Sequence, residues 1–239
     1  MTIQASIVFL GTGQGSFVVG KNVLGCGGFV LQVDDNQFHV DPGPNSLMQA
    51  ALSGVNVRAN TGVLVSHAHL HHANDLNAVI DAMTYGGADK TGVLIAPSSV
   101  VNGSGSEDRV LTSRHRSFLE KIIVMQAGQR VGVNNVEVFG LPAYHGDAET
   151  IGFKFFTPYF SLAYSSDTKF SKDIVEAMKN SNILILNVPS LLKDGAGDNL
   201  CVEDAIKIIE GVGPELAILT HFGREMVEGD SLYQIRQIQ

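Results

Sequence analysis

Four histidines stand within six residues of this chain: His67, His69, His71 and His72. The whole protein has 8 histidines in 239 residues, so this density is notable. Imidazole is the most common side-chain ligand for zinc, iron and related ions. A solvated histidine-rich loop or an expression tag is the alternative, but the segment is internal and lies between two periodic stretches. The cluster therefore predicts a metal site.

Three more candidate ligands each follow a predicted strand closely, where a side chain is well held: His145, Asp167 and His221. Taken one at a time, a capping or surface residue is the alternative interpretation of each. Together with the histidine cluster they supply six imidazoles and one carboxylate. That set is large enough for two metal ions that keep open positions for water and substrate.

The elements that must position these residues are predicted to alternate between strands and helices. An apolar run at 63–65 precedes the histidines and a helix-like stretch at 73–83 follows them, which indicates strand, loop and helix. A strand at 3–10 leads into a glycine loop after which no helical pattern is visible. A hairpin is expected with strands at 29–33 and 37–41.

From Lys121 onward, strands separated by short turns predict an antiparallel meander. Helices are expected at 171–179, 202–210 and 229–238, between and after two buried strands. Strands with interspersed helices in both halves predict an α/β fold in four layers, with two mixed sheets packed together and helices outside (αββα). We expect residues 1–239 to form one domain, since no linker or repeat is visible.

Composition narrows the class of protein. The formal net charge is −8, so the chain has no electrostatic attraction to anionic membranes or to extended nucleic acid. A small phosphorylated substrate is still compatible, because bound metals reverse the local sign. No run reaches the roughly 18–20 apolar residues of a spanning helix. The N-terminus lacks signal-peptide features, and two cysteines form no disulfide framework, so we expect a cytoplasmic protein.

Residues 97–116 are polar and rich in glycine and serine, which predicts a surface excursion or a mobile lid. The segment carries a basic cluster, with Arg114 and Arg116 as the candidates for contact with an anionic substrate. Ordinary solvated charge is the alternative interpretation.

As a set, the motifs resemble those of the metallo-β-lactamase-fold hydrolases. The family pattern is His-x-His-x-Asp-His, then a separate histidine, an aspartate and a final histidine. In this chain the matching residues are His67, His69, His72, His145, Asp167 and His221. The segments at 9–13, 40–43 and 219–223 fit as well. Within the family, the chain looks most like the branch of tRNA 3′-processing endonucleases and small phosphodiesterases.

The resemblance implies two divalent metal ions, with zinc favoured and iron or manganese as alternatives. His67, His69 and His145 would hold the first ion. His71, His72 and His221 would hold the second, and Asp167 would bridge the two. A hydroxide shared between the metals would be the nucleophile, because two cations lower the pKa of water.

Two aspartates are candidates for a supporting role. Asp41 and Asp75 could accept hydrogen bonds from the outer nitrogens of ligand histidines and so fix their tautomers. The alternatives are an ordinary turn aspartate and an ordinary helix-surface aspartate.

The chain departs from the family pattern at two places. His71 stands where the family has the motif aspartate, so the second metal loses a negative ligand and the carboxylate as proton acceptor. We expect His71 to bind through Nδ1 and, with Asp167, to act at the reacting centre; a displaced ring or a poorly filled second site is the alternative. Asn199 stands where the nuclease branch carries a histidine. An amide can orient a substrate but cannot act as an acid near neutral pH.

These features predict a cytoplasmic dinuclear hydrolase that cleaves phosphodiester bonds in a small cyclic or nucleotide-like substrate. One alternative is hydrolysis of a lactone, thioester or amide at the same metals. Another is a metal-binding sensor or degenerate scaffold with weak catalysis, which His71 and Asn199 favour. The chain ends at Gln239, soon after His221, so an exposed sheet edge and a homodimer that covers it are also expected.

Overall fold

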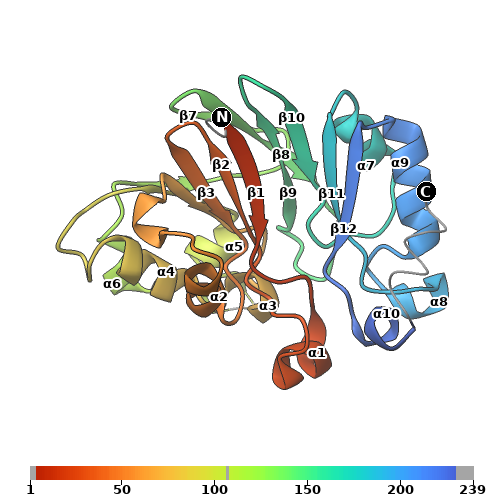
Figure 1. Ribbon diagram of the computed structural model, residues 1–239, viewed down its shortest axis with the longest axis horizontal. Helices are drawn as coiled ribbons and strands as arrows, with labels where there is room; N and C mark the ends of the chain where they lie inside the picture. Colours follow the sequence, from red (N-terminus) through yellow and green to blue (C-terminus); the bar gives the residue numbers. More distant parts are fainter. Residues whose placement is uncertain (1–3, 106–107, 230–239) are drawn as a thin grey trace. The chain divides into compact units, whose positions relative to one another are not determined.

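The computed structural model of the protein describes residues 4–105 and 108–229 (Figure 1). The chain forms two compact units. The first contains the N-terminus to Thr12 together with Asn22–Met125, and the second contains Gly13–Lys21 and the chain from Gln126. Each unit has one six-stranded sheet with both parallel and antiparallel pairs, and helices accompany both. The predicted α/β class with two mixed sheets is confirmed, and the interpretation of 1–239 as one domain stays a prediction.

The sheet of the first unit has its strands in chain order. These are β1 (Ala5–Phe9), β2 (Phe29–Val33), β3 (Asn36–Val40), β4 (Gly62–Leu64), β5 (Val93–Ala96) and β6 (Lys121–Val124). The β1–β2 and β2–β3 pairs are antiparallel. Strands β3 to β6 run parallel to one another. Since parallel strands end at one edge, the loops after β3 and β4 are neighbours there.

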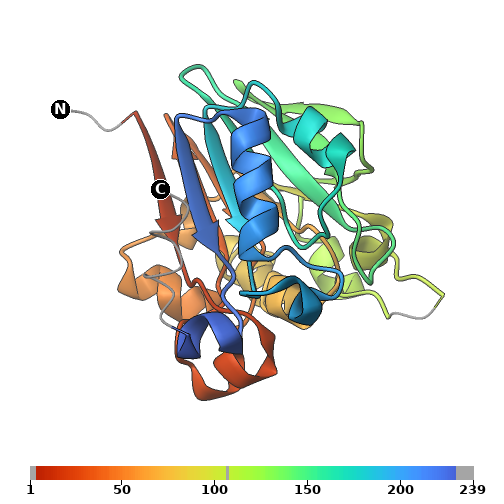
Figure 2. The same cartoon turned by 90° about the vertical axis from the view of Figure 1, so that its right-hand side faces the viewer.

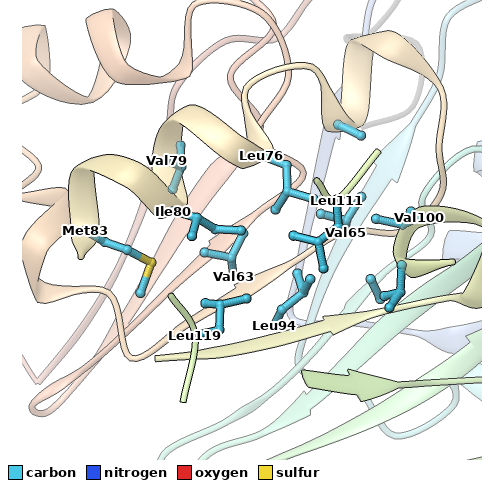
Figure 3. Close-up of a cluster of buried hydrophobic side chains, with 13 residues drawn as sticks. Val63, Val65, Leu76, Val79, Ile80, Met83, Leu94, Val100, Leu111 and Leu119 are labelled. Atoms are coloured by element: carbon cyan, nitrogen blue, oxygen red, sulfur yellow. The ribbon is translucent and has the colours of Figure 1, made fainter. Parts of the chain in front are cut away.

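Apolar packing fixes the strand that leads into the histidines. Helices α2 (Ser46–Leu52), α3 (Leu70–Ala73) and α4 (Leu76–Met83) follow the strands of this unit, with a 3₁₀ turn, η1, at Val57–Ala59. The buried side chains of α4 recur at helical spacing, at Leu76, Val79, Ile80 and Met83. Figure 3 shows them packed in one cluster with Val63 and Val65. This core holds β4 and its following loop in place.

The polar segment at 97–116 is more firmly held than its composition indicates. It contains α5 (Ser98–Val101) and α6 (Ser113–Arg116). Val100, Val101 and Leu111 are buried in the same cluster as α4. Ser104 and Gly105 between them are exposed. Both flanks of the excursion therefore belong to the core, and a lid role stays a prediction.

The sheet of the second unit reverses the chain order, with β12 at one edge and β7 at the other. Its strands are β7 (Arg130–Val133), β8 (Val136–Pro142), β9 (Ile151–Phe156), β10 (Ser161–Tyr164), β11 (Ile183–Asn187) and β12 (Leu216–Thr220). Strands β7 to β10 form antiparallel pairs, and β10, β11 and β12 are parallel. Consequently β8, β10, β11 and β12 all end at the same edge.

The helices of the second unit are α1 (Gly15–Lys21), α7 (Lys172–Met178), α8 (Lys193–Ala196), α9 (Val202–Val212) and α10 (Arg224–Glu228). Helices α7 and α9 contact each other beside the sheet (Figure 2). Among the described residues, no helix has the length and apolar character needed to cross a bilayer.

Two sequence expectations were wrong, and one lies outside the described residues. The strand at 121–124 does not belong to the meander but pairs in parallel with β5. The glycine loop at 11–15 is followed by a helix, α1. Its two glycines and two valines have weak helix propensity, so packing must stabilise it. Val18 is fully buried, and the Phe17 ring lies under the Arg224 guanidinium of α10. The expected helix at 229–238 falls almost entirely in the part that is not described.

Candidate metal centre

The first unit gathers four imidazoles between β4 and α4: His67 and His69 lie in the loop after β4, and His71 and His72 lie in the short helix α3. The ring centroids of His67 and His72 are 4.2 Å apart, and those of His71 and His72 are 4.8 Å apart. Nε2 of His67 lies 3.0 Å from Nδ1 of His69. Two nitrogens bound to one tetrahedral zinc are about 3.3 Å apart, given zinc–nitrogen bonds of about 2.0–2.1 Å. The His67–His69 pair therefore fits a shared ion.

A buried carboxylate lies behind two of these rings. Asp41 is 1% exposed, and its Oδ2 accepts a hydrogen bond from Nδ1 of His72 at 2.8 Å. The Ser66 hydroxyl donates to the same oxygen at 2.8 Å, and the Ser66 amide donates to Oδ1 at 2.7 Å. Nδ1 of His67 lies 3.0 Å from the Ser66 oxygen. Since that hydroxyl already gives its proton to Asp41, its oxygen accepts from His67.

These contacts determine the tautomers of two histidines. In His67 and His72 the proton is on Nδ1, which leaves the Nε2 lone pair available as a metal donor. The parallel pairing of β3 with β4 explains the contact, because the Asp41 amide donates to the Leu64 carbonyl at 2.8 Å. Asp41 also has a φ of 52°, in the left-handed region. Such a conformation costs about 1–3 kcal/mol and is characteristic of functional sites.

Asp75 lies at the start of α4 and has different partners. Its Oδ2 accepts a hydrogen bond from the Ser46 amide at 2.9 Å, and its Oδ1 accepts from the Asn74 side chain at 2.8 Å. The carboxylate thus supports the first turn of α2. Its expected role behind a ligand histidine stays a prediction.

The second unit gathers three candidate ligands around one carboxylate. Asp167 is 2% exposed, and each of its oxygens has an imidazole nearby. Nε2 of His221 is 3.2 Å from Oδ1, and Nε2 of His145 is 3.8 Å from Oδ2. His145 and His221 follow β8 and β12, and Asp167 follows β10. The common edge of these strands brings them together.

A residue that sequence reasoning missed holds Asp167. The Asn187 amide, at the end of β11, donates to Oδ1 of Asp167 at 2.8 Å and to the Tyr164 hydroxyl at 3.1 Å. Asn187 is 1% exposed. A polar residue that ends the otherwise apolar strand Ile-Leu-Ile-Leu-Asn was the only signal in the sequence.

The tautomer of His145 is also determined by its surroundings. Nδ1 of His145 donates to the backbone carbonyl of Asp198 at 3.0 Å, so its Nε2 carries the lone pair. The neighbouring Asn199 uses its backbone and side-chain nitrogens to bind the Ala196 carbonyl, at 2.9 and 3.2 Å. Asn199 therefore closes the turn after α8, and its substrate contact stays a prediction.

The two candidate arginines of α6 contact their own unit. Arg116 donates to the Val101 carbonyl at 3.3 Å. The Arg114 guanidinium lies 5.6 Å from the centre of the Phe118 ring, in a cation–π contact. Contact of either arginine with a substrate stays a prediction.

One further histidine of the first unit is buried without being part of the cluster. His39 in β3 is fully buried, and its Nε2 lies 3.0 Å from the Gly27 carbonyl. Burial lowers the pKa of His39, because the charged imidazolium loses its hydration there. His39 therefore stays neutral and connects β3 to the loop before β2.

Comparison with known proteins gives a family and relatives. Residues 36–222 match the family model described as the β-lactamase superfamily domain. An uncharacterized protein of Methanocaldococcus jannaschii is 30% identical over 226 residues, which cover 94% of this chain and 85% of the relative.

Several solved structures are similar in fold. The metallo-β-lactamase fold protein YhfI from Bacillus subtilis has a TM-score of 0.79 and 16% identity, over 98% of this chain and 92% of that one. A diphosphatase of the PhnP family has a TM-score of 0.71 and 16% identity, over 93% and 88%. The short form of human tRNase Z has a TM-score of 0.67 and 16% identity, over 92% and 93%. At these identities the likeness concerns the fold alone.

Proposed function

This chain belongs to the β-lactamase superfamily and has the metallo-β-lactamase fold, and we propose that it is a dinuclear metal-dependent phosphodiesterase for small cyclic or nucleotide-like substrates. The resemblance and the fold class expected from the sequence are confirmed by the same comparisons. Members of this superfamily are generally hydrolases, and the fold implies binding of divalent metal.

We propose the ligand set that the family pattern implies. His67, His69 and His145 would hold one ion, His71, His72 and His221 the other, and Asp167 would bridge them. The observation that carries this assignment is the set of partners on the outer nitrogens. The Nδ1–H groups of His72, His67 and His145 donate hydrogen bonds to Asp41, Ser66 and the Asp198 carbonyl, respectively. All three rings therefore have the Nε2 lone pair available for a metal ion.

Imidazole nitrogens and one carboxylate suit zinc, and also iron or manganese. When bound, the ions would act as Lewis acids toward water and toward a phosphoryl oxygen. The chain would contribute orientation and proton handling. Asp167 would keep both oxygens directed to the ligand side because Asn187 donates to it. His71 would occupy the position of the family's aspartate and bring a neutral ligand there in place of a carboxylate.

The substrate class is supported by charge and by the relatives. The net charge of −8 disfavours long nucleic acid. Two of the similar structures are a diphosphatase and a tRNase Z, both of which act on phosphate bonds. The two cysteines, Cys26 and Cys201, are buried thiols, which supports a reducing compartment such as the cytoplasm.

Elemental analysis of protein purified without chelator or added metal tests the metal assignment. We expect two divalent ions per chain, and His67→Ala should lower that number, because it removes a ligand of the first ion. His115→Ala is the matched control, since His115 lies in α6 with Asp81 and Thr112 as neighbours. Equal metal content in both variants would refute the assignment.

Turnover of bis-p-nitrophenyl phosphate, beside a panel of lactones and thioesters, tests the bond that is cleaved. We expect metal-dependent hydrolysis of the phosphodiester and little of the others. Preferred hydrolysis of a lactone or thioester would contradict a phosphodiesterase and leave the metal assignment intact.

A metal-binding sensor is the second candidate. It is favoured by His71 in the position of the family's aspartate, together with Asn199, whose amide binds the Ala196 carbonyl and cannot supply a proton. About one ion per chain and no turnover of any substrate in the panel would favour this candidate.

A further inference from the structure

The second unit has a pocket beside a proposed metal ligand. Its volume is about 290 Å³, and it is lined by Ala143, Tyr144, His145, Ala148, Lys169 and Asp198. Three loops form it: those after β8 and β10, and the one before α9. It therefore lies at the same edge of the sheet as Asp167 and His221. Its volume is near the lower limit of ligand pockets, which suits one small moiety rather than a polymer.

The wall that carries Lys169 is held by hydrogen bonds between two loops. The Lys169 amide donates to the Tyr144 carbonyl at 3.0 Å, and the Tyr144 amide donates to the Thr168 hydroxyl at 2.9 Å. The Tyr144 hydroxyl donates to Asp173 at the start of α7. The backbone on both sides of the pocket is thus fixed before a ligand binds, which reduces the entropy lost on binding.

The Lys169 ammonium has no protein partner among the described residues. Its side chain is exposed and has no ion pair or hydrogen bond within residues 4–105 and 108–229. Three other lysines of the same unit are engaged: Lys154 binds the Lys179 carbonyl, and Lys193 and Lys207 pair with carboxylates. In a chain of net charge −8, a cation left unpaired in a concave site favours an anionic ligand group.

Asp198 adds a negatively charged residue to the pocket lining. Its carbonyl accepts from His145, and Asp198 is an exposed residue of the pocket lining that forms no ion pair with Lys169. A carboxylate accepts hydrogen bonds from hydroxyl or amino donors. The pocket residues thus include one cation and one hydrogen-bond acceptor. A bare anion would bind the Lys169 ammonium and leave the Asp198 carboxylate without a donor. A phosphate joined to a sugar with hydroxyl groups satisfies both.

We propose that this pocket binds a terminal nucleoside monophosphate moiety of the substrate, with Lys169 on the phosphate and the Asp198 carboxylate on a ribose hydroxyl. The assignment rests on the proposed function, because His145 is common to the pocket and to the proposed metal centre. Lys169 is then a substrate-binding residue that selects substrates with a second anionic group beside the bond to be cleaved.

Binding of AMP and of inorganic phosphate to the full, metal-loaded chain tests the pocket by isothermal titration calorimetry. Lys169→Gln should weaken AMP binding about ten-fold, since a charge-assisted hydrogen bond is lost, and should reduce its dependence on salt. Lys172→Gln is the matched control, because Lys172 is also exposed and without an ion pair among the described residues, but does not line the pocket. It should leave the affinity for AMP within about two-fold, as is usual for exposed charges.

Two further variants separate binding from loss of structure. Lys169→Arg keeps the cation and should retain most of the affinity for AMP. Asp198→Asn should weaken AMP and leave inorganic phosphate no weaker, because only the ribose contact is lost. Elemental analysis of each variant checks that the metal content is that of the wild type.

The pocket assignment is overturned if the wild-type protein does not bind AMP, or if Lys169→Gln and Lys172→Gln bind it equally. Binding of AMP that depends on Lys169, without hydrolysis of any phosphodiester, would support the pocket and refute the proposed function. Hydrolysis of a phosphodiester, together with AMP binding that does not depend on Lys169, would support the proposed function and refute the pocket assignment.

Discussion

Replacement of Asp41 by asparagine tests the hydrogen-bond network behind the histidines. The carboxylate accepts hydrogen bonds from the Ser66 amide, the Ser66 hydroxyl and Nδ1 of His72, at 2.7–2.8 Å. An asparagine of the same shape has one carbonyl oxygen, so its NH₂ group must face at least one of these donors. Asp41→Asn therefore removes the negative charge and places the NH₂ group against one or two donors that the carboxylate satisfies.

The magnitude follows from these contacts. A hydrogen bond to a charged group contributes about 1.5–3 kcal/mol, and loss of one to two of them should lower the free energy of unfolding by about 2–4 kcal/mol. Loss of a partner behind a ligand histidine typically lowers metal affinity about 10–100-fold. We expect both effects, because the proton on Nδ1 of His72 and His67 is no longer held in place.

The assay is a chelator competition for metal affinity, with urea unfolding of the metal-free protein beside it. Asp204→Asn is the matched control, since Asp204 is also a buried carboxylate but has Lys193 as its ionic partner. The control should cost stability and leave metal affinity unchanged. If Asp41→Asn binds metal as tightly as the wild type, the network has no role in ligand orientation.

Three further outcomes are expected. Asn187→Leu should lower metal content or affinity about ten-fold or more, because it leaves Asp167 without its amide donor; an unchanged chelator titration would contradict this. His71→Asp should raise the affinity for the second ion, since it adds a negative ligand, whereas His71→Ala should lower it, and elemental analysis distinguishes the two. Burial lowers the pKa of His39, so the folded state resists protonation there, and its stability contribution is present above about pH 6.5 and is lost as pH falls below that value. His39→Gln should therefore reduce the fall in urea stability between about pH 7.5 and pH 5.5; an equal fall in both proteins would refute it.

Candidate ligands were predictable where a histidine or aspartate stands within a few residues of the end of an apolar strand. Asp167 and His221 come after β10 and β12, and the structure places both at the common end of those strands. The parallel pairing of β3 with β4, which brings Asp41 to the histidine loop, is a long-range contact that no local pattern specifies. Asn187 was missed for the same reason, because its partner Asp167 is distant in the chain.

Secondary structure was predictable where apolar spacing is regular. Helix α4 and strands β2 and β12 follow their patterns closely. Helix α1 was missed because its stability depends on packing with α10 rather than on propensity. Strand β6 was assigned to the wrong sheet, since Lys-Ile-Ile-Val is equally suitable for a strand in either one.

The firm packing on both sides of Ser104 and Gly105 makes this segment a place for protein engineering. Val100, Val101 and Leu111 are buried in the core, while Ser104 and Gly105 are exposed. An inserted reporter domain or a new pair of termini at this point would disturb few buried contacts. A fluorescent fusion placed here would leave every proposed metal ligand in its native sequence context.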